Sequence, residues 1–228
     1  MNKNLPVVII GIVAVIAIIG GVLLFQSSKA ENNAPKTNSN NAAAAVDKYK
    51  TAPPGAQPAW AKGSPNAAVT LEEFADFQCP SCAMFEPTMR EIKTAYGDRI
   101  RVIFRQYPLQ MHPKAYDAAR AVEAAGIQGK FWEMHDLVYD KQKDWSVMED
   151  HRKTFSEYAK TLGLDVDRFN NDLTGQLASS RVGLDKQRGD YIGIRATPSL
   201  YLNGRLLLPD EMQTVKLRQV IDDALQGK

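Results

Sequence analysis

The chain has 228 residues, enough for one or two domains and for a sizeable buried core. Its 28 Lys and Arg nearly balance its 26 Asp and Glu, which excludes a strongly basic surface, and we expect no nucleic-acid partner. With only two cysteines, the fold cannot be a disulfide-built scaffold and must depend on an apolar core.

The N-terminal segment is strongly apolar. Residues Leu5 to Phe25 carry no charge, and as a helix they would span about 30 Å, enough to cross the hydrocarbon core of a bilayer. This stretch is longer than the apolar core of a signal peptide, so it predicts a transmembrane anchor over residues 1–26. The alternative is a cleaved signal peptide, because Ser28 and Ala30 place small residues at the two positions that a signal peptidase reads.

Residues 27–58 are rich in Asn, Ala, Ser, Pro and Lys and show no sustained apolar period. This composition predicts a disordered linker that holds a folded domain near the membrane without fixing its orientation. A cluster of prolines ends the linker, and Trp60 marks the beginning of an ordered domain over residues 59–228.

Residues Val69 to Phe74 form the first strand pattern of this domain. Alternation places Glu73 on the same face as Val69 and Leu71. A carboxyl group there is either a partly buried acid with a raised pKa or the solvated end of the strand. The pattern leaves both alternatives open.

The motif Cys79-Pro80-Ser81-Cys82 lies where the strand pattern changes to a helical one. If the helix begins at Cys79, unpaired backbone N–H groups and the helix dipole favour a thiolate there. A lowered pKa would make Cys79 the nucleophile. Cys82 would lie one turn further on the same side, shielded, and could resolve a mixed disulfide formed at Cys79.

Two other roles for the cysteine pair are weaker. Zinc usually needs a second pair of Cys or His ligands, and His112, His135 and His151 are not at paired ligand spacing. A purely structural disulfide stabilises mainly by closing a loop in the unfolded chain, and this loop would be nearly the smallest one. The motif therefore favours redox chemistry.

The helix after the motif is predicted to run from Cys79 to about Tyr96 and to end at Gly97. Residues 100–107 then alternate as a second strand. A strand, a helix and a strand in this order predict a parallel βαβ unit.

The second half of the chain begins with helical patterns over residues 113–189, which we interpret as an insertion. A hairpin follows over residues 199–208, with Asn203 and Gly204 at its turn. Apolar spacing predicts a closing helix over residues 212–225.

This order of elements resembles the thioredoxin fold in its DsbA-like form, over about residues 60–226. The motifs that carry the resemblance are FADFQCPSC, FRQYPL, FWEMHDL and RATPSLYLNG. The resemblance extends to membrane-anchored, single-domain DsbA-like proteins of bacteria. It implies an α/β thioredoxin fold with a helical insertion between its βαβ and ββα halves, preceded by a transmembrane helix and a disordered linker.

Carried over by position, Cys79 resembles the attacking cysteine and Cys82 the resolving one, so that the pair would form the redox disulfide. Pro198 matches the cis-proline that packs against the motif, and Thr197 matches the residue whose backbone pairs with the substrate. Glu73 falls where the fold keeps a buried acid that exchanges a proton with the inner cysteine.

The resemblance implies a thiol:disulfide oxidoreductase, an enzyme that introduces disulfide bonds into unfolded or reduced secreted and envelope proteins. We expect no cofactor and no metal at the site. The scattered acids form no recognisable calcium loop, so the sequence neither predicts nor excludes a structural metal. Reoxidation would come from a quinone-linked membrane partner of the DsbB type or the vitamin K epoxide reductase type. Ser81 occupies the position where the strongest oxidants of the family carry a histidine, so we expect an oxidant of moderate strength.

We expect the protein in the cell membrane as a single-pass protein, with its catalytic domain on the periplasmic or extracellular face. The reason is that a stable catalytic disulfide and its clients belong outside the cytoplasm. Cleavage of the N-terminal segment would instead give a secreted protein.

Two other functions remain open. A disulfide reductase or isomerase would use the same site, although isomerases of this superfamily usually carry an N-terminal dimerisation domain where this chain has a linker. A tethered binding module or holdase would use the groove beside Pro198 without turnover. Replacing Cys79 by Ser would leave the function of such a module intact.

Overall fold

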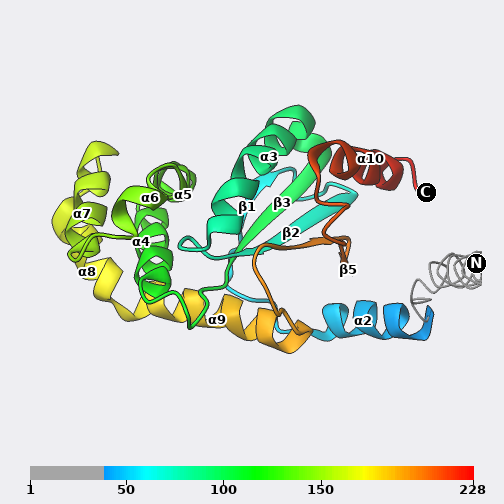
Figure 1. Cartoon of the computed structure of the whole chain (residues 1–228), viewed down its shortest axis with the longest axis horizontal. Helices are drawn as coiled ribbons and strands as arrows, with labels where there is room; N and C mark the ends of the chain where they lie inside the picture. Colours follow the sequence, from blue (N-terminus) through cyan, green and yellow to red (C-terminus); the bar gives the residue numbers. More distant parts are fainter. Residues whose placement is uncertain (1–38) are drawn as a thin grey trace, which may run out of the picture. The chain divides into compact units, whose positions relative to one another are not determined.

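A computed structural model describes residues 39–228 of the chain (Figure 1). The predicted anchor over residues 1–26 and the first part of the predicted linker lie outside the described residues. Between residues 39 and 228, no helix combines the length and the apolar character needed to cross a membrane.

A five-stranded mixed sheet forms the centre of the fold, with strand order β1-β3-β2-β4-β5. Its strands are β1 (Trp60–Gly63), β2 (Val69–Ala75), β3 (Ile100–Gln106), β4 (Ser199–Leu202) and β5 (Arg205–Leu206). Helix α3 (Pro80–Tyr96) joins the parallel strands β2 and β3, which confirms the predicted βαβ unit. The other neighbouring strands are antiparallel. The sequence pattern did not predict β1, because so short a strand shows no period.

The predicted hairpin turn is present between β4 and β5. Asn203 and Gly204 both have positive φ angles, 47° and 88°, as the turn types that match the twist of a hairpin require. The second strand ends at Leu206, two residues before the predicted end. The chain turns away after it, and the Glu211 carboxylate accepts the backbone N–H of Leu208 at 2.7 Å.

Helices fill the chain between β3 and β4, as predicted. They are α4 (Ala115–Ile127), α5 (Phe131–Asp140), α6 (Gln142–Trp145), α7 (His151–Thr161), α8 (Val166–Thr174) and α9 (Gln176–Ile192). Helix α4 lies at the centre of this group, because its many alanines allow α5, α7, α8 and α9 to pack closely around it. Figure 1 shows the group gathered beside the sheet, with α9 returning beneath it.

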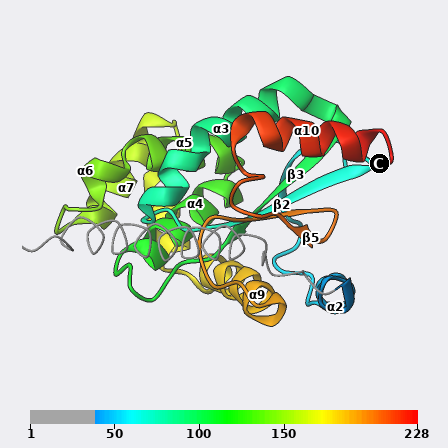
Figure 2. The ribbon, with the colours of Figure 1, turned by 45° about the vertical axis from the view of Figure 1, so that its right-hand side comes forward.

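Helices cover both faces of the sheet. Helices α3 and α10 (Thr214–Leu225) pack over apolar side chains on one face, and α9 crosses the other, as Figures 1 and 2 show. Alternation along β2 turns Val69 and Leu71 toward α3 and α10. Glu73 lies on this face too, close to charged groups of α3, whereas its neighbour Glu72 points to α9.

The structure differs from the predicted disordered linker over residues 39–58. Residues Ser39–Thr51 form helix α2, whose Tyr49 stacks on Tyr201 with ring centroids 5.2 Å apart. The chain that follows lies against the domain, where Ala56 is only 1% exposed. The linker prediction is therefore wrong for this stretch.

Arginines hold the end of the segment through its backbone: Arg181 donates to the carbonyl oxygens of Gln57 (3.1 Å) and Pro58 (3.0 Å), and two further arginines hold the residues before them. Arg105 donates to the carbonyl oxygens of Pro54 (2.9 Å) and Ala56 (3.0 Å), and Arg188 donates to that of Pro53 (2.8 Å). Composition predicts disorder because the segment offers few apolar side chains. The segment is ordered instead because its backbone carbonyl oxygens accept hydrogen bonds from arginine side chains far along the chain. The composition of the segment does not report these partners.

Buried carboxylates fix Arg105 and Arg188 in place. Arg105 pairs with Glu72 at 2.6 Å and with Asp185 at 2.9 Å, and Arg188 pairs with Glu72 at 2.8 Å. All four residues are less than 9% exposed. Removing one member of such a network leaves an uncompensated buried charge, which is strongly destabilising.

We expect Arg105→Ala to lower the free energy of unfolding by about 3–5 kcal/mol, because Glu72 and Asp185 lose a shared buried partner. Urea unfolding of the purified chain measures the change. The control is Arg101→Ala on the same strand, because Arg101 has no ion pair within residues 45–228. Equal midpoints for the two variants would contradict the assigned role of the network.

Candidate active site

Cys79 lies at the junction of β2 and α3. After β2 the chain turns through Asp76, whose carboxylate accepts the N–H of Gln78 (2.7 Å) and whose carbonyl accepts the N–H of Cys79 (3.1 Å). Cys79 is the N-cap residue of α3, and Pro80 occupies the first helical position, where its missing N–H costs no helical hydrogen bond. The sulfur of Cys79 therefore lies at the positive end of the helix dipole, as predicted.

The two cysteines have opposite environments. Both are free thiols, and Cys82 is 1% exposed against 6% for Cys79. A hydrogen bond from the Cys82 thiol is the main cause that lowers the pKa of Cys79 to about 5. Burial raises the pKa of Cys82 well above its ordinary value, and its hydrogen bond to Cys79 adds to the effect. At neutral pH, Cys79 is a thiolate and Cys82 a thiol.

Thr197 and Pro198 face the cysteine pair from the bend just before β4, and the peptide bond between them is cis. The Cys79 sulfur lies 3.4 Å from the carbonyl oxygen of Thr197. The buried Thr197 hydroxyl has no hydrogen-bond partner in the described part of the chain. It contributes to the lowered pKa of Cys79 and opposes part of the rise in the pKa of Cys82. The structure thus brings together four of the five residues that the sequence predicted for this site, Cys79, Cys82, Thr197 and Pro198.

Glu73 lies inside the molecule, on the face of the sheet that α3 covers. It is 3% exposed, and burial, with a contribution from the charge of Glu86, raises its pKa to about 8. Of the two alternatives left open by the strand pattern, the structure therefore shows a buried acid. Its role in proton exchange with Cys82 stays a proposal.

Sequence reasoning missed three side chains that shape the site. Gln142 of α6 donates to the carbonyl oxygens of Phe77 (2.8 Å) and Cys79 (2.9 Å), and so ties the helical insertion to the start of α3. His112 lies 2.7 Å from Asp76, whose backbone N–H donates to the Cys82 sulfur at 3.5 Å. No spacing in the sequence signals these contacts. The contacts of Gln142 and His112 join segments more than 30 residues apart, and the contact between Asp76 and Cys82 is made by a backbone group.

A groove of about 480 Å³ borders the exposed side of the motif. Ser81 and Met84 line one wall, and Pro198 and Met212 line the opposite one. Met84 is 74% exposed, and methionine adapts its shape to varied apolar partners. The groove can therefore receive apolar side chains beside Cys79.

The structure gives no support to a zinc site at the cysteines. Within residues 39–228, the cluster of side chains close enough to share a metal ion consists of Glu86, His135 and Asp136, and it includes neither cysteine. The arrangement of the cysteine pair suits thiol chemistry instead.

We expect the Cys79 thiolate, followed by its absorbance at 240 nm, to titrate near pH 5. In Cys82→Ala the titration should move to clearly higher pH, because the main hydrogen bond to the thiolate is lost. The matched control is Ser81→Ala, which keeps the backbone N–H that helps to lower this pKa. An unchanged titration in Cys82→Ala would contradict the assigned cause.

Comparison with known proteins finds relatives that are much longer than this chain. NhaA 1, a Na(+)/H(+) antiporter of Mycolicibacterium gilvum (strain PYR-GCK), is 37% identical over 149 residues, which is 63% of this chain and 23% of the antiporter. The chain thus spans less than a quarter of the length of such curated relatives.

Two crystal structures share the fold. The thiol-disulfide exchange protein alpha-DsbA2 of Wolbachia pipientis superposes with a TM-score of 0.70 and 18% identity, over 82% of this chain and 99% of that one. Oxidised BdbD of Bacillus subtilis superposes with a TM-score of 0.65 and 24% identity, over 74% of this chain and 94% of that one. A family profile described as thioredoxin matches residues 56–223, a span that holds the cysteine pair, Glu73, Thr197 and Pro198. The chain belongs to the thioredoxin family.

Proposed function

We propose that this protein is an extracytoplasmic thiol:disulfide oxidoreductase that donates the Cys79-Cys82 disulfide to reduced secreted or envelope proteins. The observation that carries the proposal is the pairing of a stabilised Cys79 thiolate with a buried Cys82 thiol. A stabilised thiolate favours the dithiol form over the disulfide, and a protein with that preference is an oxidant.

The reaction begins with the disulfide form. A client thiolate attacks the Cys79 sulfur, the bond between Cys79 and Cys82 breaks, and Cys82 leaves with the electron pair. A second client thiolate then attacks the client sulfur of the mixed disulfide and releases Cys79 as a thiolate. Two electrons pass from the client to the protein, and the client gains one disulfide.

The surroundings of Cys79 support binding of an extended client segment. Cys79 is largely covered, so a client reaches its sulfur along the groove between Met84 and Pro198. The Thr197 backbone beside the sulfur offers polar groups to the client's main chain. We propose that Glu73 supplies the proton that the departing Cys82 takes up.

Repeated turnover requires reoxidation. We propose a quinone-linked membrane protein of the DsbB or vitamin K epoxide reductase type as the electron acceptor. We also propose that the apolar segment over residues 5–25 anchors the domain in the cell membrane, where it would remain near such a partner.

We expect a reduction potential between about −120 and −180 mV, measured by equilibration against glutathione. A value near about −270 mV would favour a reductase function over an oxidase function, since thioredoxin holds its disulfide at that potential.

Ser81→His should raise the reduction potential above that of the unaltered chain, because an imidazolium at the helix start adds to thiolate stabilisation. If Cys79→Ser retained full function in cells, a binding module would be the better explanation.

We expect the dithiol form to be more stable than the disulfide form at neutral pH, and the difference to depend on pH. The pKa of Cys79 is lower in the folded than in the unfolded chain, so its contribution is fully present above about pH 9. The contribution shrinks as the pH falls and is lost below about pH 5. Thermal unfolding of both redox forms from pH 4 to 9 measures it, and a constant difference would contradict the assignment.

A further inference from the structure

A second group of polar side chains lies behind Cys82, between α3, α5 and the sheet. Its members are Glu73 of β2, Glu86, Arg90 and Lys93 of α3, and His135, Asp136 and Tyr139 of α5. Nothing in the exchange reaction so far uses the members from α3 and α5. Glu73, Glu86, His135 and Tyr139 are at most 5% exposed. Buried polar groups are costly to keep, which raises the question of what they do.

His135 connects a buried carboxylate with an exposed one. Its Nδ1 lies 2.9 Å from Asp136 Oδ1, and its Nε2 lies 3.9 Å from Glu86 Oε2. The side chain of His135 is fully buried and that of Glu86 is 3% exposed, whereas the side chain of Asp136 is 46% exposed. One buried imidazole ring therefore lies between an interior carboxylate and a surface carboxylate.

The inner atoms of this arrangement are free to pass a proton. Glu86 Oε2, His135 Nε2 and the Tyr139 hydroxyl have no hydrogen-bond partner in the part of the chain that the structure describes. The separation of 3.9 Å between Glu86 and His135 exceeds a hydrogen bond. A small rotation of the Glu86 carboxylate closes it, because only its other oxygen is held, by Lys93 at 3.1 Å and Arg90 at 3.2 Å.

The inner end of the group reaches the cysteine pair. Glu86 lies one helical turn after Cys82 on the same face of α3. The charges of Glu73 and Glu86 act on one another, and the Tyr139 hydroxyl feels the charges of Cys82, Glu73 and Glu86 together. These groups therefore interact inside the domain, and Tyr139 packs in the same buried cluster as Cys82.

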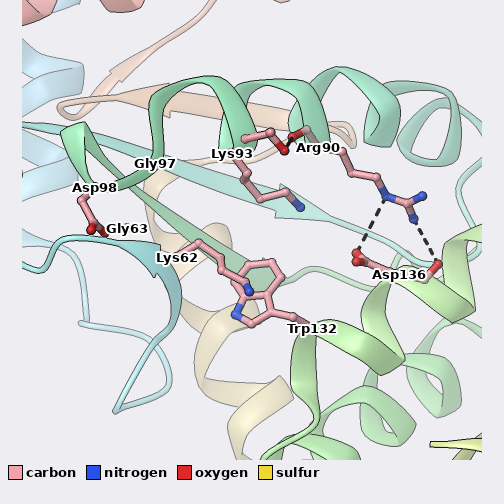
Figure 3. A pocket seen from close by; sticks show the side chains of 9 residues that line it. Lys62, Gly63, Arg90, Lys93, Gly97, Asp98, Trp132 and Asp136 are labelled. Carbon is pink, nitrogen blue, oxygen red and sulfur yellow. Dashed lines mark hydrogen bonds and ion pairs between the residues drawn. The ribbon is translucent and has the colours of Figure 1, made fainter.

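The outer end of the group opens into a pocket of about 430 Å³ on the far side of α3. Figure 3 shows Arg90 and Lys93 reaching down from α3 toward Asp136 and Trp132 of α5. Lys93 also lies over the Trp132 ring, 5.0 Å from its centre. Water in this pocket can exchange protons with Asp136.

We propose that His135 and Glu86 relay protons between Glu73, the proposed proton donor to Cys82, and the solvent-exposed carboxylate of Asp136. The relay rests on the proposed thiol-disulfide exchange. When a client thiolate breaks the disulfide, the Cys82 thiolate takes a proton from Glu73. Glu86 and His135 then return a proton from the pocket to Glu73. Of the two protons that the client loses, one thus ends on Cys82, and the other stays in solution because Cys79 remains a thiolate.

The protonation states of the group fit this role. Burial lowers the pKa of His135, so the neutral ring can accept a proton on one nitrogen and donate from the other. Burial raises the pKa of Glu73 to about 8, which leaves it protonated and able to donate at neutral pH. The charged and titratable groups that face them are Cys82, Glu86, Arg90, Lys93, Asp136 and Tyr139.

Glu86, His135 and Asp136 are also close enough to share a metal ion. Lys93 and Arg90, however, bind the same Glu86 carboxylate, and two cations next to a ligand oxygen oppose a third. Glu86 and Asp136 also approach opposite nitrogens of the ring. The relay is the better explanation of this geometry.

The test follows reaction of the reduced full-length chain with oxidised glutathione, by rapid acid quench and mass spectrometry. In the first phase the Cys79 thiolate attacks, forms the mixed disulfide and releases one glutathione. In the second phase Cys82 loses its proton, attacks Cys79 and releases the other. The first phase therefore reports the proposed function, and the second reports the proton route.

We expect His135→Phe and Glu86→Gln to slow the second phase by about tenfold to a hundredfold, with the first phase unchanged. In the unaltered chain, the second rate should rise with pH to a plateau above about pH 8, and it should be slower in D2O; both dependences should weaken in the variants. The control is Asp140→Asn, which removes a carboxylate of α5 that also binds Arg90 (2.8 Å) but lies outside the relay. It should leave both phases unchanged.

Each other outcome has a definite meaning. If both folded variants keep the rate, the pH profile and the D2O effect of the second phase, the relay is overturned. The proposed function would then still stand. Absence of the first phase in the unaltered chain would overturn both. Stoichiometric zinc in the purified chain, lost in His135→Phe, would overturn the relay in favour of a metal site.

Discussion

The hydrogen bond between the Cys82 thiol and the Cys79 sulfur requires both residues to lie in the first turn of α3, and three distant parts of the chain hold that turn. Strand β2 fixes where the helix begins. Gln142 ties the Cys79 carbonyl to the helical insertion, and Thr197 closes the site from the bend before β4. The preference for a thiolate at Cys79 is therefore a property of the whole domain rather than of the motif alone.

Two neighbouring acids on β2 show how strongly position decides chemistry. Glu72 and Glu73 point to opposite faces of the sheet. Glu72 meets Arg105 and Arg188 and belongs to the buried network that holds the N-terminal segment. Glu73 has no ion pair within residues 45–228 and keeps a raised pKa, which suits a group that exchanges protons.

Much of the fold was predictable, because it depends on local signals. A change from strand to helix period located the CxxC turn, and Asn203 with Gly204 located the hairpin. The prediction failed for residues 39–58, where order depends on arginines more than 45 positions away. Local composition cannot report such partners.

The sequence by itself determined where the candidate site residues lie. The cysteine pair at a helix start follows from spacing and residue type, which are local properties of a chain, whereas the roles of Glu73, Thr197 and Pro198 are implied by the resemblance of the surrounding motifs to a known family. Only the tertiary structure decided that Glu73 is buried, that Gln142 and Asp76 support the cysteine turn, and that Glu86 and His135 are buried side by side. A pKa and a proton route depend on which groups are neighbours in space, and packing of distant segments sets those neighbours.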